Sequence, residues 1–298
     1  QIPEYATTVA SFATFQSLVY TFAGSDPLSL AIVNGLIAVL IPFPLHYVMK
    51  KLYPTLRTTY LPALLVLFLP LPFVMLTVPM RDSLTVLSFA TLLALFVQAI
   101  VDRSLWSLTV AFPLWGLLYL FRPELALVLV VGGGAAVSIF GIDTLTDRTI
   151  ALQDLLVTIV PMGVLGFILF TTRYPFDKVQ GQLSYRASGS AVYLESFQYT
   201  SWLDVIVSAP GRAIYFQFAP FPLHVDQVFH LLALLSLPVL IVLTVAAAFS
   251  IYECESNRIA LVFLLVVYGA GIVGYGLIDS NFGTTTRHRV PFVFLLVV

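Results

Sequence analysis

Three consecutive basic or titratable residues, Arg287, His288 and Arg289, follow the polar stretch NFGTTT in an otherwise apolar part of the chain. Guanidinium groups bind phosphate oxygens in pairs, and an imidazole adds a hydrogen bond or a proton. Three such residues in a row exceed what anchoring a helix at a membrane surface requires. We interpret them as contacts to an anionic ligand, with interfacial anchoring as an equally weighted alternative.

Two further groups combine acids with bases, Arg81 with Asp82 and Arg122 with Glu124, and Asp279 is a third acid of this kind. The carboxylates are candidate catalytic acids or bases, and Arg81 and Arg122 are candidate contacts to a donor phosphate. Single arginines at helix ends more often anchor the helix in the headgroup layer. Asp82 has an equally weighted alternative, in which it caps the helix that follows it or pairs with Arg81.

The remaining residue types exclude several classes of site. His46, His224 and His230 lack the spacing of metal ligands, and the single Cys254 excludes an internal disulfide. The net charge of −1 does not favour a nucleic-acid partner. The triple glycine at 132–134 lies inside an apolar run, which favours close helix packing over a phosphate loop. We expect no metal and no cofactor, although the sequence does not exclude a divalent ion.

The elements that must position these residues are membrane helices. Of the 298 residues, 59% are hydrophobic and only 10% are charged, whereas a soluble domain has about 25% charged residues. The sequence therefore predicts an all-α fold, a polytopic transmembrane helical bundle. The predicted spans are the long apolar runs 28–49, 60–80, 83–101, 104–121, 124–141, 150–171, 227–250 and 259–278, with another beginning at Val290.

We divide the chain into transmembrane helices at 1–171, an extracytoplasmic interfacial loop at 172–226, and transmembrane helices at 227–298. The loop has about 50 residues, which is marginal for a core of its own. Within it, the stretch WLDVIVSAPGRAIYFQFAPFP predicts a short amphipathic helix, a Pro-Gly turn and an aromatic run. The first apolar stretch, 6–23, contains many hydroxyl groups, so we expect it to lie in the interface.

The orientation follows from the positive-inside rule. Lys50, Lys51 and Arg57 share one short loop, which places that loop in the cytoplasm. Counting spans from there puts 172–226 and the polar stretch around Arg287 on the outer face. The chain starts without Met and ends inside an apolar run, so we expect it to be an internal piece of a longer protein.

The polar groups also carry a resemblance to a known superfamily. The stretches LPLPFVMLTVPMRDSLTVLSFATLLALFVQAI, LLYLFRPELALVL, APGRAIYFQFAPFPLH and DSNFGTTTRHRVPF occur in the order in which similar stretches occur there. The chain resembles relatives of the GT-C glycosyltransferases, the superfamily of protein O-mannosyltransferases and aminoarabinose transferases. The resemblance implies polyprenyl-phosphate-linked sugars as donors and transfer on the outer face of the membrane.

The resemblance also implies roles for single residues. Asp82 would be an acid of the second outer loop, while the main catalytic acid belongs to a loop expected upstream of Gln1. Arg287, His288 and Arg289 would contact the donor phosphate. Of the two arginines we expect Arg287 to point into the site, because it precedes the helix that follows, and we expect Asp82, Glu124 and Arg287 to line one cavity at the outer surface. The loop that presents them would be shaped by Asn281, Gly283 and Thr284.

We therefore expect a multi-pass glycosyltransferase-like protein of the plasma membrane, acting in surface polysaccharide or glycoprotein synthesis. Its partners would be membrane lipid and the lipid-linked sugar. The alternatives are an oligosaccharide-unit polymerase, a lipid-linked sugar flippase or other transporter, and a non-catalytic membrane subunit. Transporters usually carry ionisable groups near the midplane and internal repeats. Here the charges gather at span ends and no repeat is visible, which favours the enzyme.

Overall fold

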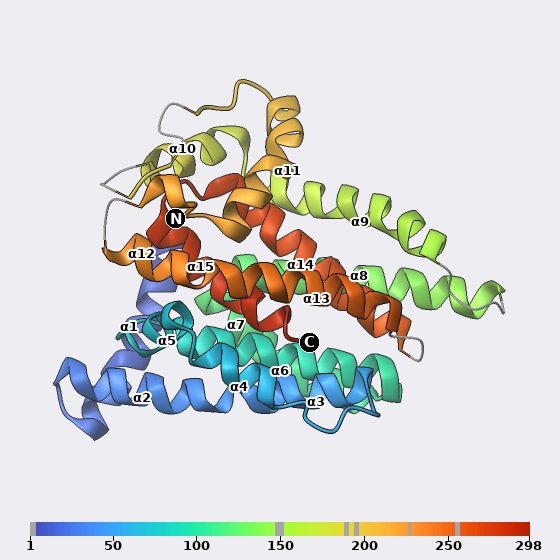
Figure 1. The fold of residues 1–298 in the computed structure, drawn as a ribbon, viewed down its shortest axis with the longest axis horizontal. Coiled ribbons are helices and arrows are strands. Elements are labelled where there is room, and N and C mark those ends of the chain that lie inside the picture. Colours follow the sequence, from blue (N-terminus) through green and yellow to red (C-terminus); the bar gives the residue numbers. More distant parts are fainter. Residues whose placement is uncertain (1–3, 147–151, 188–190, 194–196, 226–227, 254–256) are drawn as a thin grey trace. The chain divides into compact units, whose positions relative to one another are not determined.

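The computed structural model describes most of the chain, namely residues 4–146, 152–187, 191–193, 197–225, 228–253 and 257–298. These residues form helices throughout and no β-strand, apart from an isolated antiparallel bridge between Val192 and Asn281 (Figure 1). The all-α class predicted from the sequence is confirmed.

The chain divides into two compact units, which are described separately. The first unit comprises Gln1–Val130, Cys254–Leu261 and Val297–Val298. The second unit comprises Val131–Glu253 and Val262–Leu296. The predicted boundaries at 171 and 226 both fall inside the second unit. They divide the chain by its position relative to the membrane, and that division stays a prediction.

Within the described residues, 5 helices are long and apolar enough to cross a membrane: Pro27–Leu52, Asp82–Asp102, Pro123–Phe140, His230–Ile251 and Arg258–Ile278. Three shorter apolar helices occupy Val9–Ala23, Leu105–Phe121 and Val160–Arg173. A length of about 20 apolar residues matches the hydrocarbon thickness of a bilayer. The chain therefore has the helices of a multi-pass membrane protein.

The run 60–80 does not form the single span predicted for it. It breaks into α4 (Leu61–Leu67) and α5 (Pro70–Thr77), with Leu69 in an extended conformation at φ −60° and ψ 140°. Pro70 explains the break, because proline lacks a backbone N–H and disfavours a helical conformation at the preceding residue. Apolar composition alone does not reveal this interruption.

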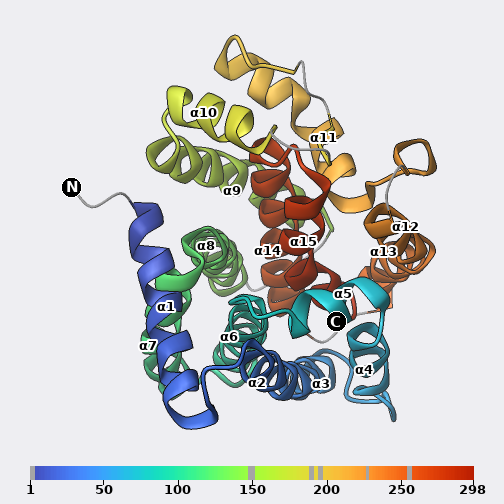
Figure 2. The ribbon, with the colours of Figure 1, turned by 90° about the vertical axis from the view of Figure 1, so that its left-hand side faces the viewer.

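In the first unit, α6 (Asp82–Asp102) packs against α7 (Leu105–Phe121) on one side and against α2 (Pro27–Leu40) and α3 (Pro42–Leu52) on the other, as Figure 2 shows. The remaining helix of this unit at the N-terminus is α1 (Glu4–Ala23). Because neighbours lie on both sides, α6 buries more than one of its faces; its buried apolar side chains are Val86, Phe89, Ala90, Leu92, Leu93, Ala94 and Val97.

A buried amide connects two elements of the first unit. Asn34 of α2 is fully buried, and its Nδ2 donates to the carbonyls of Val78 at 2.7 Å and Met80 at 2.8 Å. Its Oδ1 accepts from the Ser83 hydroxyl at 2.9 Å. The Asn34 side chain thus pairs with two carbonyls of the turn before α6 and with a hydroxyl in the first turn of that helix. These bonds fix where α6 begins relative to α2.

The second unit contains the C-terminal part of α8 and seven further α-helices in the described residues. Their bounds are α8 Pro123–Thr146, α9 Leu152–Arg173, α10 Phe176–Arg186, α11 Trp202–Phe218, α12 Val228–Leu235, α13 Leu237–Glu253, α14 Arg258–Ile278 and α15 Phe282–Leu295. A short 3₁₀ turn, Pro222–His224, follows α11.

The segment 172–226 is helical over much of its length, and its position outside the membrane stays a prediction. The predicted turn at Pro210 lies inside α11, which runs without interruption from Trp202 to Phe218. A reciprocal capping box starts this helix, in which Ser201 Oγ accepts from Asp204 N and Asp204 Oδ2 accepts from Ser201 N. Proline removes only one donor from the helix, and the buried face of α11 outweighs that loss.

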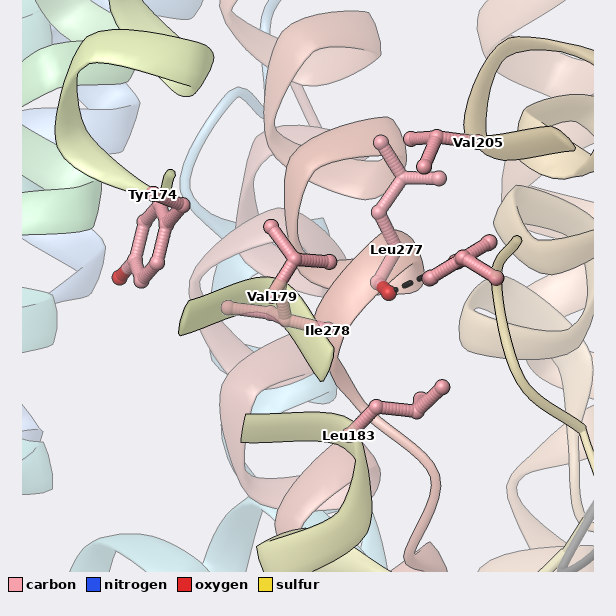
Figure 3. Close-up of a cluster of buried hydrophobic side chains, with 7 residues drawn as sticks. Tyr174, Val179, Leu183, Val205, Leu277 and Ile278 are labelled. Atoms are coloured by element: carbon pink, nitrogen blue, oxygen red, sulfur yellow. Dashed lines mark hydrogen bonds between the residues drawn. The ribbon is translucent and has the colours of Figure 1, made fainter. Parts of the chain in front are cut away.

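α10 packs on the end of α14 through apolar side chains. Val179 and Leu183 of α10 lie beside Leu277 and Ile278 (Figure 3). The Tyr199 hydroxyl donates to the Leu277 carbonyl at 2.9 Å, which satisfies one of the last carbonyls of α14. This apolar cluster holds α10 against the residues that follow α14.

Two glycines allow α14 to approach its neighbours closely. A Cβ atom on Gly276 would lie 2.9 Å from the carbonyl oxygen of Arg212 in α11. A Cβ atom on Gly271 would overlap the ring of Phe292 in α15. Small residues of this kind bring helix backbones together in membrane proteins. These contacts bring α11 and α15 close to α14.

Candidate functional site

The most polar group of buried residues in the second unit is centred on Asp279, directly after α14. Its side chain is fully buried, and each carboxylate oxygen has a basic partner. Oδ1 accepts from Arg186 Nη1, at the end of α10. Oδ2 lies 2.8 Å from His288 Nδ1 of α15. One carboxylate thus joins two helices that are far apart in the sequence.

The backbone of Asp279 is held as firmly as its side chain. Its carbonyl accepts from the Tyr193 hydroxyl at 2.8 Å and from Arg212 Nη2 at 2.7 Å. The Tyr193 hydroxyl also lies 2.9 Å from Thr285 Oγ1. The turn between α14 and α15 is therefore fixed by side chains from the segment before α11 and from α11 itself.

Three guanidinium groups act on the hydroxyl of Tyr193. Burial raises the pKa of this phenol, while the hydrogen bond to Thr285 and the charges of Arg212, Arg289 and Arg186 lower it. Charges influence a pKa strongly only at short range. The three arginines therefore surround one point of the second unit, beside the single carboxylate of Asp279.

The stretch that precedes the basic trio is helical. Asn281 is the N-cap of α15, and its Oδ1 accepts from Gly283 N at 2.9 Å and Thr284 N at 3.4 Å. We predicted a loop here, and that prediction is wrong, because asparagine is a strong N-cap and the following threonines are buried. Asn281, Gly283 and Thr284 thus shape the first turn of a helix.

The basic trio lies beyond the first turn of α15, and its members differ in burial. Arg289 is 1% exposed and His288 is 8% exposed, whereas Arg287 is half-buried. We expected Arg287 to be the inward arginine. The structure instead buries Arg289, because residues three and four positions apart share a helix face and Arg289 follows the buried Thr285 and Thr286.

Two buried arginines cap helix ends. Arg289 Nη1 donates to the carbonyls of Gln217 at 2.7 Å, Ala219 at 2.8 Å and Phe216 at 3.3 Å, at the C-terminus of α11. Arg212 Nε donates to the Gly276 carbonyl at 2.8 Å, near the C-terminus of α14. Cations at a helix C-terminus donate hydrogen bonds to its last carbonyls and interact favourably with the negative end of the helix dipole.

Sequence reasoning missed the contributions of Arg186 and Arg212. A visible signal for Arg212 was its place in an apolar stretch, APGRAIYF, where an arginine has to find acceptors. Arg186 stands in the polar helix α10 and carries no local signal. Its partner Asp279 is 93 residues away in the sequence.

The predicted acid Asp82 and the predicted phosphate contact Arg122 form an ion pair inside the first unit. Arg122 Nη2 lies 2.5 Å from Asp82 Oδ1, and both side chains are 4% exposed. Arg122, at the end of α7, is thus a partner of Asp82 that the sequence did not suggest. Glu124, in the first turn of α8, and Arg81 are half-buried.

Asp82 and Arg122 are thus brought together in one unit, and Asp279, Arg186 and His288 in the other. The predicted cavity common to Asp82, Glu124 and Arg287 spans both units and stays a prediction. Among the described residues, no three His, Cys, Asp or Glu side chains gather in a way that would hold a metal ion. The catalytic and phosphate-binding roles assigned from the sequence also stay predictions.

The Asp279–His288 pair has the geometry of a carboxylate that orients an imidazole. When Nδ1 carries the proton and donates to the carboxylate, Nε2 becomes the basic nitrogen of the ring. Such a pair accepts a proton from a hydroxyl group placed at Nε2. No family model, no curated protein and no solved structure matches the chain.

Proposed function

We propose that this protein is a glycosyltransferase-like enzyme of the membrane, which transfers a sugar from a polyprenyl-phosphate-linked donor to an acceptor hydroxyl. The observation that supports this most directly is the buried Asp279–His288 pair, at 2.8 Å, in a protein built from apolar helices. A buried carboxylate is costly unless it is paired. This one is paired with the imidazole of His288, the side-chain type that most often serves as a general base.

In the proposed reaction, His288 Nε2 takes the proton of the acceptor hydroxyl. The oxygen of that hydroxyl forms a bond to the anomeric carbon, and the bond from this carbon to the lipid phosphate breaks. The phosphate leaves as an anion, and Arg287, which is half-buried, is placed one residue away to stabilise it. Asp279 holds the imidazole orientation and stabilises the imidazolium that forms.

The position of the charged residues favours an enzyme over a transporter. Asp279 directly follows the apolar helix Arg258–Ile278, and Arg186 ends α10. Transport sites usually lie near the midplane, at breaks in spanning helices. If the helix Arg258–Ile278 spans the bilayer, a site at its end would lie at the depth of a lipid phosphate, which supports a lipid-linked donor.

The test is transfer activity in the full-length protein, reconstituted in nanodiscs with a radiolabelled polyprenyl-phosphate sugar and an acceptor. We expect His288→Gln to lower the turnover at least about a hundredfold, which is the contribution of one general base. The residual rate should lose the rise with pH that titration of the imidazole produces. His46→Gln is the matched control, because His46 belongs to the first unit and contacts Thr59.

Two results would contradict the proposal. One is wild-type protein that binds the lipid-linked sugar and leaves it intact with every acceptor supplied. The other is a His288→Gln protein that stays folded and retains the wild-type rate and pH profile. Release of the intact lipid-linked sugar to the opposite leaflet would instead identify the flippase.

A further inference from the structure

Arg289 uses only one edge of its guanidinium group on the protein. Nη1 donates to three carbonyls at the end of α11, as described above. Nε and Nη2 are buried, and neither has a hydrogen-bond partner among the residues that the structure describes. These two nitrogens form the side-on fork of the guanidinium, whose parallel N–H groups match two oxygens of one oxyanion.

Gln217 places a second unsatisfied polar group at the same junction. Its backbone carbonyl accepts from Arg289 Nη1 at 2.7 Å, so the two residues are direct neighbours. Its side chain is 2% exposed, and within the described part of the chain neither Nε2 nor Oε1 has a partner. Buried amides in native proteins are nearly always hydrogen-bonded, so the amide of Gln217 calls for a partner that the described residues do not supply.

The charge of Arg289 also lacks a counter-ion. No described carboxylate forms an ion pair with it, since Asp279 is taken by Arg186 and His288. The C-terminal dipole of α11 compensates only part of a full charge. A guanidinium stays protonated at neutral pH, so a buried cation remains for which the described residues supply no anion.

We propose that the junction of α11 and α15 is an oxyanion site. Two oxygens of a phosphate or phosphate monoester bind the Nε and Nη2 fork of Arg289, and Gln217 Nε2 donates to a third oxygen. The oxyanion supplies the missing negative charge and the missing acceptors together. The site involves neither Asp279 nor His288, so it stands whether or not the transferase proposal holds.

The shared chemistry allows two sources, free phosphate and the phosphate head of a lipid. We would measure binding of inorganic phosphate and of octyl phosphate to the full-length protein, in nanodiscs of zwitterionic lipid. Phosphorus NMR line broadening reports both ligands. Binding of inorganic phosphate assigns the free anion, whereas binding of octyl phosphate alone assigns a lipid head. Either result supports the oxyanion site.

Three variants locate the binding. Arg289→Lys keeps the charge and loses the fork, and we expect binding to weaken by at least about tenfold. Gln217→Leu removes the amide while its backbone carbonyl still accepts from Arg289, so α11 keeps its cap. It should weaken binding severalfold without a change in melting temperature. Arg103→Lys is the control, because Arg103 is exposed and belongs to the first unit.

The proposal is overturned if neither probe binds wild-type protein. It is also overturned if both probes bind Gln217→Leu and Arg289→Lys as tightly as they bind the wild type. The first outcome would mean that the amide of Gln217 turns and satisfies the fork internally. The second would place the phosphate at another basic residue.

Discussion

Asp279 and His288 are joined across the turn between α14 and α15, with Oδ2 of the carboxylate 2.8 Å from Nδ1 of the imidazole. The other carboxylate oxygen is bound by Arg186. Because Asp279 is fully buried, its removal would leave two basic groups without their acceptor. The Asp279 carboxylate therefore has two roles. It orients the imidazole in the proposed proton transfer, and it links α10 and α15 to the end of α14.

We predict that Asp279→Asn destabilises the second unit strongly. Removing one partner of a buried ion pair costs about 3–5 kcal/mol, because the remaining charge stays buried without compensation. Asp177→Asn is the matched control on α10, since Asp177 is exposed and its loss should cost less than about 1 kcal/mol. Denaturant unfolding in detergent micelles measures both. Equal, small losses would show that the Asp279 pairs contribute little.

We predict opposite effects for two glycines of the same helix. In Gly276→Ala the new Cβ would lie 2.9 Å from the Arg212 carbonyl, so α11 and α14 must separate. Overpacking of this kind costs about 1–3 kcal/mol. At Gly269 a Cβ meets nothing within 4 Å, so Gly269→Ala should gain up to about 1 kcal/mol from helix propensity. Melting temperatures that change in the same direction would contradict the packing.

We predict strong coupling between Asp82 and Arg122. Each single replacement, Asp82→Leu or Arg122→Met, removes one partner of a buried ion pair, whereas the double replacement removes both charges. The double variant should therefore lose less stability than the two single variants lose in sum, by a coupling energy of about 1–3 kcal/mol. The half-exposed pair Lys51–Asp102 is the control, and its coupling should stay below about 1 kcal/mol. Additive effects at Asp82 and Arg122 would show that the pair is not formed.

We predict that 172–226 lies on the outer face of the membrane and that the loop at 50–57 lies in the cytoplasm. Cys254 is replaced first, and single cysteines are then placed at the exposed positions Leu223 and Leu56. An impermeant maleimide added to intact cells should label Leu223→Cys and leave Leu56→Cys unlabelled until the membrane is opened. The reverse pattern would overturn the orientation and, with it, an active site on the outer face.

The sequence predicted the helical class, and among the described residues 5 of the eight complete spans that it predicted are helices long and apolar enough to cross a membrane. It failed where single residues interrupt or start a helix. The span predicted at 60–80 breaks at Pro70, although the whole run is apolar. The loop predicted after Asn281 is the first turn of α15, because the asparagine caps it. In each case a local backbone effect decides against the average composition.

For the candidate site, the sequence identified residues and the structure determined their partners. Asp279, His288 and Arg289 stood out because charged side chains are rare in so apolar a chain. Their order of burial did not follow from the sequence, because it depends on which face of α15 meets α11 and α14. The expected inward residue, Arg287, lies on the more exposed face.

By itself the sequence determined that the chain is helical and contains membrane-length helices, because its continuously apolar runs of about 20 residues are too long for the alternating strands of a membrane barrel. The tertiary structure alone decided which carboxylate meets which base. Asp279 finds Arg186 at a separation of 93 residues and Asp82 finds Arg122 at a separation of 40. Such pairings depend on how helices pack, and composition and local periodicity carry no information about partners that distant in the chain.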